Sequence, residues 1–334
     1  MRRLALLLAL PLAAAPATAQ VLPSFGSDRA GTVGLQFLKI PADARSIALA
    51  NTGVSTAHDA SALFWNPALA TEGSGRQVQL ARASYFSGQL FTNNFAAATY
   101  PVGRFVLGAS VQVLDSGEMD VTTEVQPGGT GETFRFVDVA LGATLSQKLT
   151  DQFAYGVTLK GIRESTADVN TTTAALDVGI HYKVGDTGAR MAVAIRNFGL
   201  DGTPEGSLDR IDPAAPGGTA VVDSFTAITV PTSFLLGLSY DVKRLGPNHA
   251  LTVSSQLYSP NDNASSLGLA AEYTFRDLLS LRTGYRFGGG DEAQFSAGGG
   301  VAFPALGARA RFDYAYARYR LLGNVHAVGL HLGF

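Results

Sequence analysis

The stretch SFLLGLSYDV, residues 233–242, alternates between two kinds of side chain. In an extended chain Phe234 and Leu236 share one face, while Ser239 and Asp241 share the other. This period of two predicts a β-strand with one apolar face and one polar face. A segment of about ten residues is also long enough to cross a bilayer at a tilt.

The same alternation recurs along most of the chain. Comparable runs occupy residues 105–113, 137–145, 155–160, 174–184, 267–275, 281–287, 295–303 and 309–316. A soluble β-sandwich alternates too, but aromatic residues gather near the ends of these segments, as in the girdles of membrane barrels. We therefore predict an all-β fold, a transmembrane antiparallel β-barrel of about 14 strands within residues 76–334.

The connections between the predicted strands support this prediction. Short turns at Pro101–Arg104, Thr150–Asp151 and Gly185–Gly188 alternate with connections that include two long ones, at Asp115–Glu132 and Phe198–Val230. Bacterial outer-membrane barrels have short periplasmic turns and longer external loops. The two long connections are therefore predicted to be external and are candidate contacts for partners.

Charged side chains fall on the polar face of the predicted strands. The candidate lumen charges are Glu272, Arg282, Arg286, Arg309, Arg311 and Asp313. They fit either a polar path that binds a carboxylate or an ion-pair network that ties the wall to a plug. We favour the network, because both signs of charge occur on neighbouring strands.

Both ends of the chain carry targeting features. Residues 1–19 combine Arg2 and Arg3 with an apolar run and a small-residue site at Ala17–Ala19, which predicts a cleaved signal peptide. A membrane anchor is the alternative, but the apolar run is shorter than the ~20 residues that a spanning helix needs. The final residue, Phe334, resembles the assembly signal of bacterial outer-membrane barrels. We predict a location in the bacterial outer membrane, with outer-membrane lipid and the barrel-assembly machinery as partners.

The residue inventory argues against several functions. The chain has no cysteine, 16% charged residues and a net charge of −2, so it lacks the basic footprint of a nucleic-acid-binding protein. Its five histidines do not show the spacing of metal ligands. His58 and Asp59 follow Ser55, but closeness in sequence is poor evidence for a catalytic triad. We expect no enzyme activity, no catalytic residue, no metal and no cofactor.

Residues 20–75 do not alternate. They mix short apolar runs with glycine and proline, and they contain Trp65, the single tryptophan. A barrel of about 14 strands has a lumen too wide for its own side chains to fill. We therefore predict that this segment is a plug, or hatch, with Trp65 in the lumen and Pro67 ending the plug. The alternative is a periplasmic arm in which Trp65 belongs to an ordinary loop.

Two stretches resemble a known family. The segment FLKIPADARSIALANTGVSTAHDASALFWNPALA looks like the N-terminal region of the PorV/PorQ family, which belongs to the FadL-like group of outer-membrane barrels. In that group the hatch carries an Asn-Pro-Ala box, which here is Asn66-Pro67-Ala68, preceded by Asp59 and Trp65. The ending FDYAYARYRLLGNVHAVGLHLGF is similar to the family's closing hairpin. One departure is Leu69, where the family usually has glycine.

The resemblance implies a function as well as a fold. It implies a non-enzymatic role in type IX protein secretion or surface attachment, in which the barrel binds secreted proteins or a surface protease or sortase that processes them. A FadL-like channel for uptake of hydrophobic small molecules is the alternative. A purely structural barrel is a third possibility.

Overall fold

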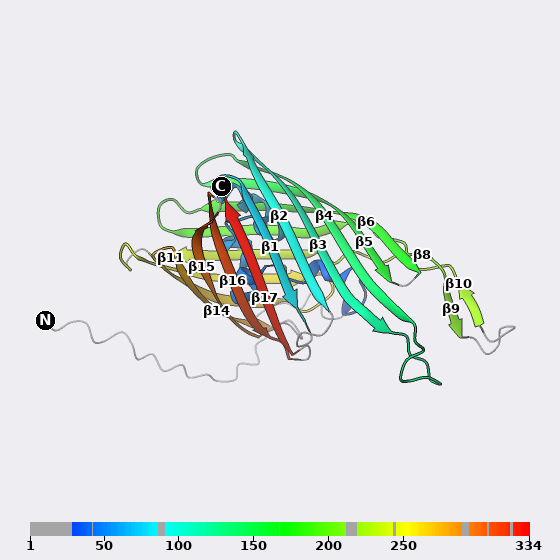
Figure 1. Ribbon diagram of the computed structural model, residues 1–334. Coiled ribbons are helices and arrows are strands. Elements are labelled where there is room, and N and C mark those ends of the chain that lie inside the picture. Colours follow the sequence, from blue (N-terminus) through cyan, green and yellow to red (C-terminus); the bar gives the residue numbers. More distant parts are fainter. Residues whose placement is uncertain are drawn as a thin grey trace, which may run out of the picture.

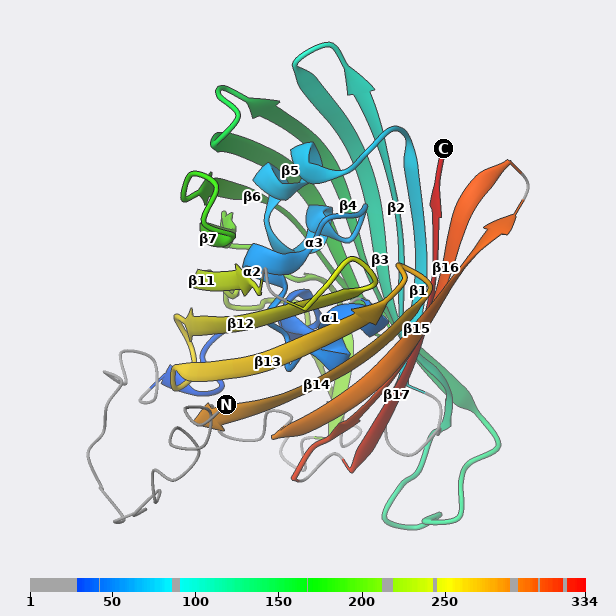
Figure 2. The same cartoon turned by 90° about the vertical axis from the view of Figure 1, so that its left-hand side faces the viewer.

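The computed structural model describes residues 29–41, 43–85, 91–166, 168–211, 219–242, 245–288, 294–305, 307–320 and 323–334. The segment predicted to be a signal peptide lies outside these ranges. The described chain forms a closed antiparallel β-barrel with short helices inside it (Figures 1 and 2). The wall has 14 strands, which confirms the predicted fold class.

The wall strands follow one another in chain order. They are β1 (Gln77–Ser84), β2 (Thr92–Val102), β3 (Phe105–Asp120), β4 (Thr133–Lys148), β5 (Phe153–Thr166), β6 (Val169–Lys183), β7 (Ala189–Gly199), β11 (Ser233–Asp241), β12 (His249–Pro260), β13 (Ser266–Phe275), β14 (Leu279–Gly288), β15 (Phe295–Ala305), β16 (Ala308–Arg318) and β17 (Asn324–Gly333). Each pairs with its neighbours, and the pairing of β1 with β17 closes the ring.

The alternation in the sequence sorts side chains between lipid and lumen. Large apolar residues such as Leu141, Leu159 and Leu281 point outward and are 59%, 61% and 66% exposed. Their neighbours in the strands, such as Ala140 and Arg282, point inward and are buried. This arrangement suits a wall with hydrocarbon outside and a packed polar interior.

One end of the barrel has short turns, and at the other end the strands continue into long hairpins. The β13–β14 turn needs only residues 276–278, with Arg276 and Asp277 both in the left-handed region that a tight hairpin requires. At the opposite end β3 and β4 reach 16 residues each, so strand pairing extends into the predicted loop Asp115–Glu132.

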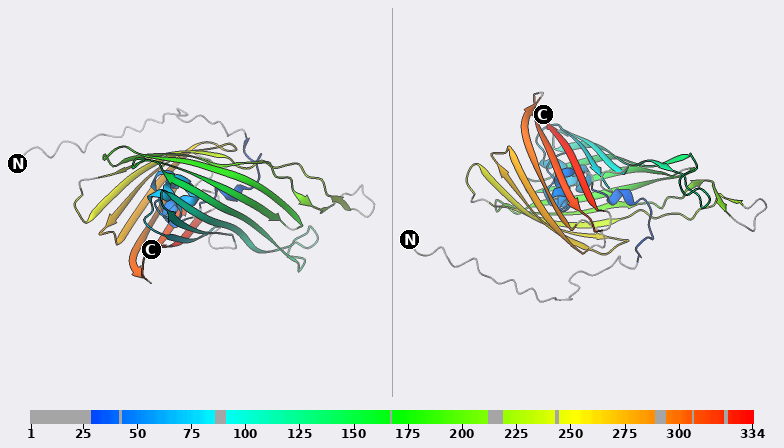
Figure 3. Two further views of the ribbon diagram at one scale, coloured as in Figure 1. Left: turned by 90° about the horizontal axis from the view of Figure 1, so that it is seen from above. Right: turned by 60° about the horizontal axis from the view of Figure 1, so that its bottom comes forward.

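The predicted loop Phe198–Val230 also contains strand. It holds β8 (Glu205–Gly206), which pairs with β6, and the separate hairpin of β9 (Leu208–Ile211) and β10 (Thr219–Val222). The β9–β10 hairpin and the end of the β3–β4 hairpin extend past the barrel at the same end (Figures 1 and 3). By the rule that short turns are periplasmic, this extended end is the external one.

Within the described ranges, five short helical segments lie inside the barrel, as Figure 2 shows for α1, α2 and α3. They are η2 (Gln36–Lys39), α1 (Ala44–Ala48), α2 (Gly53–Thr56), α3 (Ala62–Trp65) and η3 (Pro67–Glu72). We call residues 29–75 the hatch segment. Its apolar side chains form three buried clusters together with inward residues of the wall. Among the described residues, no helix combines the length and the apolar character needed to cross a membrane.

Candidate functional site

The Asn-Pro-Ala box fastens the hatch segment to the wall. Asn66 accepts a hydrogen bond from the backbone N–H of Ala68 (3.0 Å) and so caps η3, which starts at Pro67. Its side-chain amide donates to the carbonyl of Val54 (3.1 Å) within the hatch segment and to that of Ile180 (3.1 Å) on β6. One buried amide therefore joins two hatch helices and the wall.

Two glycines form the seat on which this box rests. Gly156 of β5 and Gly179 of β6 are direct cross-strand partners, and both face the lumen beneath the box. A Cβ on Gly156 would lie 2.5 Å from the carbonyl carbon of Pro67, and a Cβ on Gly179 would collide with Asn66. Beside them Ser146 donates to the carbonyl of Pro67 (2.6 Å). The sequence analysis missed this seat, although glycine at an inward strand position was the available signal.

Trp65 lies in the lumen, buried to 3% exposure. Its indole N–H donates to Asp43 (2.7 Å), whose other carboxylate oxygen caps α1 by accepting from the N–H of Ser46 (2.8 Å). Burial raises the pKa of Asp43 above its ordinary value. The ring packs against Gly53, where a Cβ would come within 2.5 Å of it. Trp65 thus connects α3 to α1 and α2.

A continuous chain of ion pairs starts and ends on the hatch segment. Arg45 of α1 contacts Glu272 on β13 (2.5 Å), and Glu272 contacts Arg282 on β14 (2.6 Å). Arg282 continues to Asp313 on β16 (2.6 Å).

The chain then returns to the hatch through one arginine. Arg311 bridges Asp313 (2.7 Å) and Asp59 (2.5 Å). Burial is the largest single influence on the pKa of Asp59 and raises it, but Arg311, His331, His58 and Arg45 together outweigh burial and hold that pKa well below the usual range. Four of the six residues predicted as lumen charges, Glu272, Arg282, Arg311 and Asp313, therefore lie in one network with Arg45 and Asp59.

The other predicted site residues lie apart from this network. Arg286 is buried in the lumen nearer the external end and donates to the carbonyl of Ala50 (2.6 Å). Arg309 is exposed at the periplasmic rim and donates to the carbonyl of Asp277 (2.6 Å). Phe334 pairs its backbone with Arg76 and exposes 57% of its surface. Its role as an assembly signal stays a prediction.

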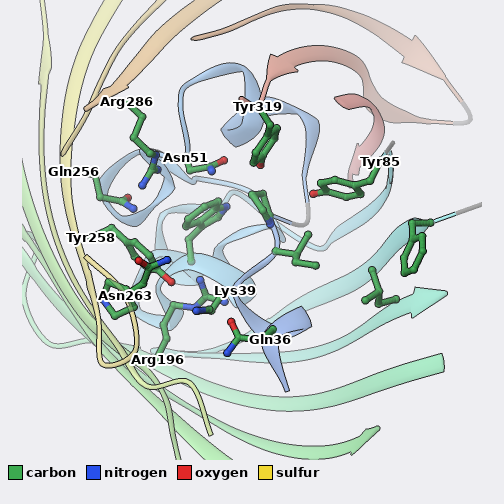
Figure 4. A pocket seen from close by; sticks show the side chains of 16 residues that line it. Gln36, Lys39, Asn51, Tyr85, Arg196, Gln256, Tyr258, Asn263, Arg286 and Tyr319 are labelled. Atoms are coloured by element: carbon green, nitrogen blue, oxygen red, sulfur yellow. The ribbon is translucent and has the colours of Figure 1, made fainter. Parts of the chain in front are cut away.

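A cavity of about 420 Å³ lies between the external side of the hatch segment and the wall (Figure 4). Its apolar and aromatic lining comes from Ile40, Pro41, Trp65, Tyr85, Phe91, Leu114, Tyr258, Pro260 and Tyr319. Its polar lining comes from Gln36, Lys39, Asn51, Arg196, Gln256, Asn263 and Arg286. Among the described residues, three cations and no carboxylate line the cavity, although Lys39 is paired with Asp262 (2.7 Å).

Several buried polar atoms in this lining have no hydrogen-bond partner among the described residues. They are Nε2 of Gln256, Nε of Arg196, the hydroxyl of Tyr85 and Oδ1 of Asn51. Buried polar groups in native proteins are nearly always hydrogen-bonded. Their convergence on one cavity is the arrangement expected of a site whose ligand or water supplies the missing partners. None of these four residues was predicted from the sequence to belong to a binding site, because they come from distant parts of the chain.

A second cavity of about 840 Å³ lies on the periplasmic side of the hatch segment. Arg45, Glu272, Arg282 and Arg311 of the ion-pair network line it, whereas none of these four residues lines the external cavity. His58 projects into this lower cavity, and Arg45 beside it, together with desolvation inside the lumen, lowers the pKa of the imidazole to about 4. Within the described ranges, no group of three His, Cys, Asp or Glu residues is placed to hold a metal ion.

The fold is shared with solved outer-membrane channels. CymD, a monoaromatic hydrocarbon channel, is 13% identical with a TM-score of 0.61, covering 88% of this chain and 97% of its own. The toluene transporter TodX of Pseudomonas putida is 12% identical with a TM-score of 0.61 and the same coverage. A FadL homologue of Pseudomonas aeruginosa is 14% identical with a TM-score of 0.57, covering 88% and 98%. The protein is thus an outer-membrane β-barrel of the FadL-like fold.

The sequence assigns the chain within that class. A family model described as type IX secretion system protein PorV matches residues 24–198, which is more than half of the 334 residues. The chain therefore belongs to the PorV family, as its terminal motifs predicted. No curated protein matched the sequence.

Proposed function

We propose that this barrel acts in type IX protein secretion by binding exported proteins, or the surface machinery that processes them, at its external end. The observation that carries the proposal is the PorV-family match in a barrel whose strands extend as arms past the external mouth. The proposed role is non-enzymatic.

The external arms have the character of a docking surface. Val125, in the β3–β4 connection, is 89% exposed, and Val221 of β10 is 66% exposed. Both lie on the segments that extend past the barrel (Figures 1 and 3). Exposed apolar side chains on such arms favour contact with another protein. The β9–β10 hairpin also has two unpaired strand edges among the described residues, and a strand of a partner can pair with such an edge.

The closed lumen favours binding over conduction of proteins. Asn66 and the ion pairs fasten the hatch segment to three wall strands, β6, β13 and β16, and Arg282 on β14 links the last two. A polypeptide could cross this lumen only after those buried contacts break. The barrel is therefore better suited to receive an exported protein outside than to carry it through.

A photocrosslinking experiment tests this role. A benzophenone amino acid replaces Val221 in the full chain in its native membrane, and captured species are identified by mass spectrometry. Replacement of Leu159, which faces lipid with 61% exposure, is the control. We expect exported proteins or a surface protease to be captured from position 221 and not from position 159. Equal capture from both positions, or capture of no protein from position 221, would contradict the proposal.

A second candidate is a channel for hydrophobic small molecules, favoured by the external cavity above the hatch segment. Trp65 lines that cavity and is the only tryptophan, so its fluorescence reports on the site directly. Titration of the purified barrel with toluene tests this candidate. A saturable change in Trp65 emission is the expected result, and Leu114→Arg should abolish it because the longer, charged side chain would occupy the cavity. No saturable change would exclude the channel for this ligand.

A further inference from the structure

The outer face of the wall carries a groove along β2. Its floor is made by Ala96 and Ala98, which are small, and its sides by larger neighbours such as Leu80 on β1 and Val111 on β3. Two hollows of about 390 and 570 Å³ follow one another along β2, between Asn94 and Tyr100. The upper hollow is lined mainly by aliphatic side chains, and the lower one adds the aromatic rings of Tyr100 and Phe334 to Val78, Ala98, Leu107 and Ala109. The surface of both is mainly apolar, so the groove has the character of a seat for a hydrocarbon chain.

A cation, Arg82, lies at the external end of this groove. Arg82 of β1 lines the upper hollow, is exposed on the outer face, and has no hydrogen bond or ion pair among the described residues. Asp115 is the acidic group near enough to interact with Arg82, but Arg135 already binds its carboxylate, with one Nε–Oδ1 contact of 2.8 Å. The charge of Arg82 is thus left without a contacting partner in the described chain.

The depth of Arg82 in the membrane makes a charge without a contacting partner unusual. Arg76 stacks on Tyr100 (4.8 Å to the ring centre) near the periplasmic end of the wall, and Arg82 lies six residues further along the same strand direction. A strand tilted by about 45° rises roughly 2.3 Å per residue, so the Cα of Arg82 lies roughly 14 Å above Arg76, within an apolar band of about 25 Å. The long side chain then reaches toward the external interface.

An arginine in that position is stabilised by an anion from outside the chain. A charged group on the lipid-facing side is costly unless it is paired, and the phosphates of lipids are the anions that a membrane supplies at the interface. The guanidinium group matches phosphate through paired N–H···O bonds.

We propose that the β1–β2–β3 groove binds a phosphate-bearing lipid, with one acyl chain along Ala96 and Ala98 and the phosphate against Arg82. The site is separate from the secretion role and from the lumen cavities, and it does not depend on either. It gives the barrel a fixed lipid on one side of its wall.

Native mass spectrometry of the full-length, delipidated barrel tests the site. The probe is dioleoylphosphatidic acid, compared with dioleoylglycerol, which has the same chains and no phosphate. Arg82→Gln removes the charge, Arg82→Lys keeps it, and Ala96→Phe fills the groove. Arg163→Gln is the matched control, because Arg163 also faces outward but is bonded to Asn170 (3.2 Å).

We expect one tightly retained phosphatidic acid on the unaltered barrel and on Arg163→Gln. Arg82→Gln should bind it roughly tenfold more weakly, because a charge-assisted bond to phosphate is lost, while Arg82→Lys retains most of the binding. Ala96→Phe should weaken phosphatidic acid and dioleoylglycerol alike. Equal binding of phosphatidic acid to Arg82→Gln and the unaltered barrel would overturn the proposal. So would an Ala96→Phe variant that keeps its lipid but loses a co-purifying protein, because the groove would then be a protein interface.

Discussion

Gly156 and Gly179 face each other across β5 and β6, and together they leave the space that Asn66 and Pro67 occupy. The shapes of the wall and the hatch segment therefore fit so closely that only the hydrogen atom of a glycine side chain has room at these two positions. A side chain as small as a methyl group at either glycine would displace the Asn-Pro-Ala box.

Substitution of this seat should loosen the hatch segment. In Gly179→Ala the new methyl group collides with Asn66, so the box must move and its bond to Ile180 is lost. We expect single-channel conductance in planar bilayers to rise above that of the unaltered barrel. Gly161→Ala on the adjacent strand β5 is the control, because a Cβ on Gly161 meets nothing within 4 Å. A Gly179→Ala barrel as tightly closed as Gly161→Ala would contradict this account of the seat.

Breaking the ion-pair chain should destabilise the barrel. Arg311→Met leaves Asp59 and Asp313 buried without their shared partner, which typically costs about 3–5 kcal/mol. Thermal unfolding, followed by the loss of heat-modifiable migration on gels, measures the effect. Arg309→Met is the matched control on the same strand, because Arg309 contacts only a rim carbonyl among the described residues. Equal melting temperatures for the two variants would show that the network contributes nothing beyond a surface contact.

The hatch segment should respond to acid through His58. Its pKa of about 4 in the folded barrel is below the ordinary value of 6.5, so the unfolded chain takes up the proton first. The stability that follows from a neutral His58 is complete above about pH 6.5 and is lost as the pH falls toward 4. An NMR titration of the His58 ring should therefore show a midpoint near 4.

A variant of Arg45 tests whether its charge causes the lowered pKa of His58. Because Arg45 is the largest influence on His58, Arg45→Gln should move the midpoint upward toward 6.5. Hydrogen exchange of the hatch segment at pH 5 provides a second readout. A midpoint for His58 near 6.5 in the unaltered barrel would contradict the proximity of Arg45.

Trp65→Phe tests the link between Trp65 and Asp43. The variant keeps an aromatic ring against Gly53 but leaves Asp43 without its indole donor, and a buried acceptor that loses its partner costs about 1–3 kcal/mol. We expect faster hydrogen exchange in residues 44–48 and 62–65. Phe64→Leu, next to it on α3, keeps the Asp43 bond and serves as the control. Unchanged exchange in Trp65→Phe would mean that the indole N–H does not hold the two helices together.

The sequence by itself determined the class of fold and the location of the protein. Alternation is a local property, because adjacent side chains in a strand must point to opposite sides whatever the partner strand is. Runs such as Phe234 to Asp241 therefore predicted a membrane barrel before any pairing was known. The terminal motifs, from Asn66-Pro67-Ala68 to Phe334, indicated the family for the same reason, since each motif is contiguous in the chain.

Only the tertiary structure decided which of these residues meet. Arg311 joins the network and Arg309 does not, although both were predicted to face the lumen, because their depths in the lumen differ by two residues of one tilted strand. The lining of the external cavity brings Tyr85, Arg196 and Gln256 together from three distant strands or strand ends. Such contacts depend on the register between strands and on how the hatch segment packs, and neither property is encoded by a pattern within a single segment.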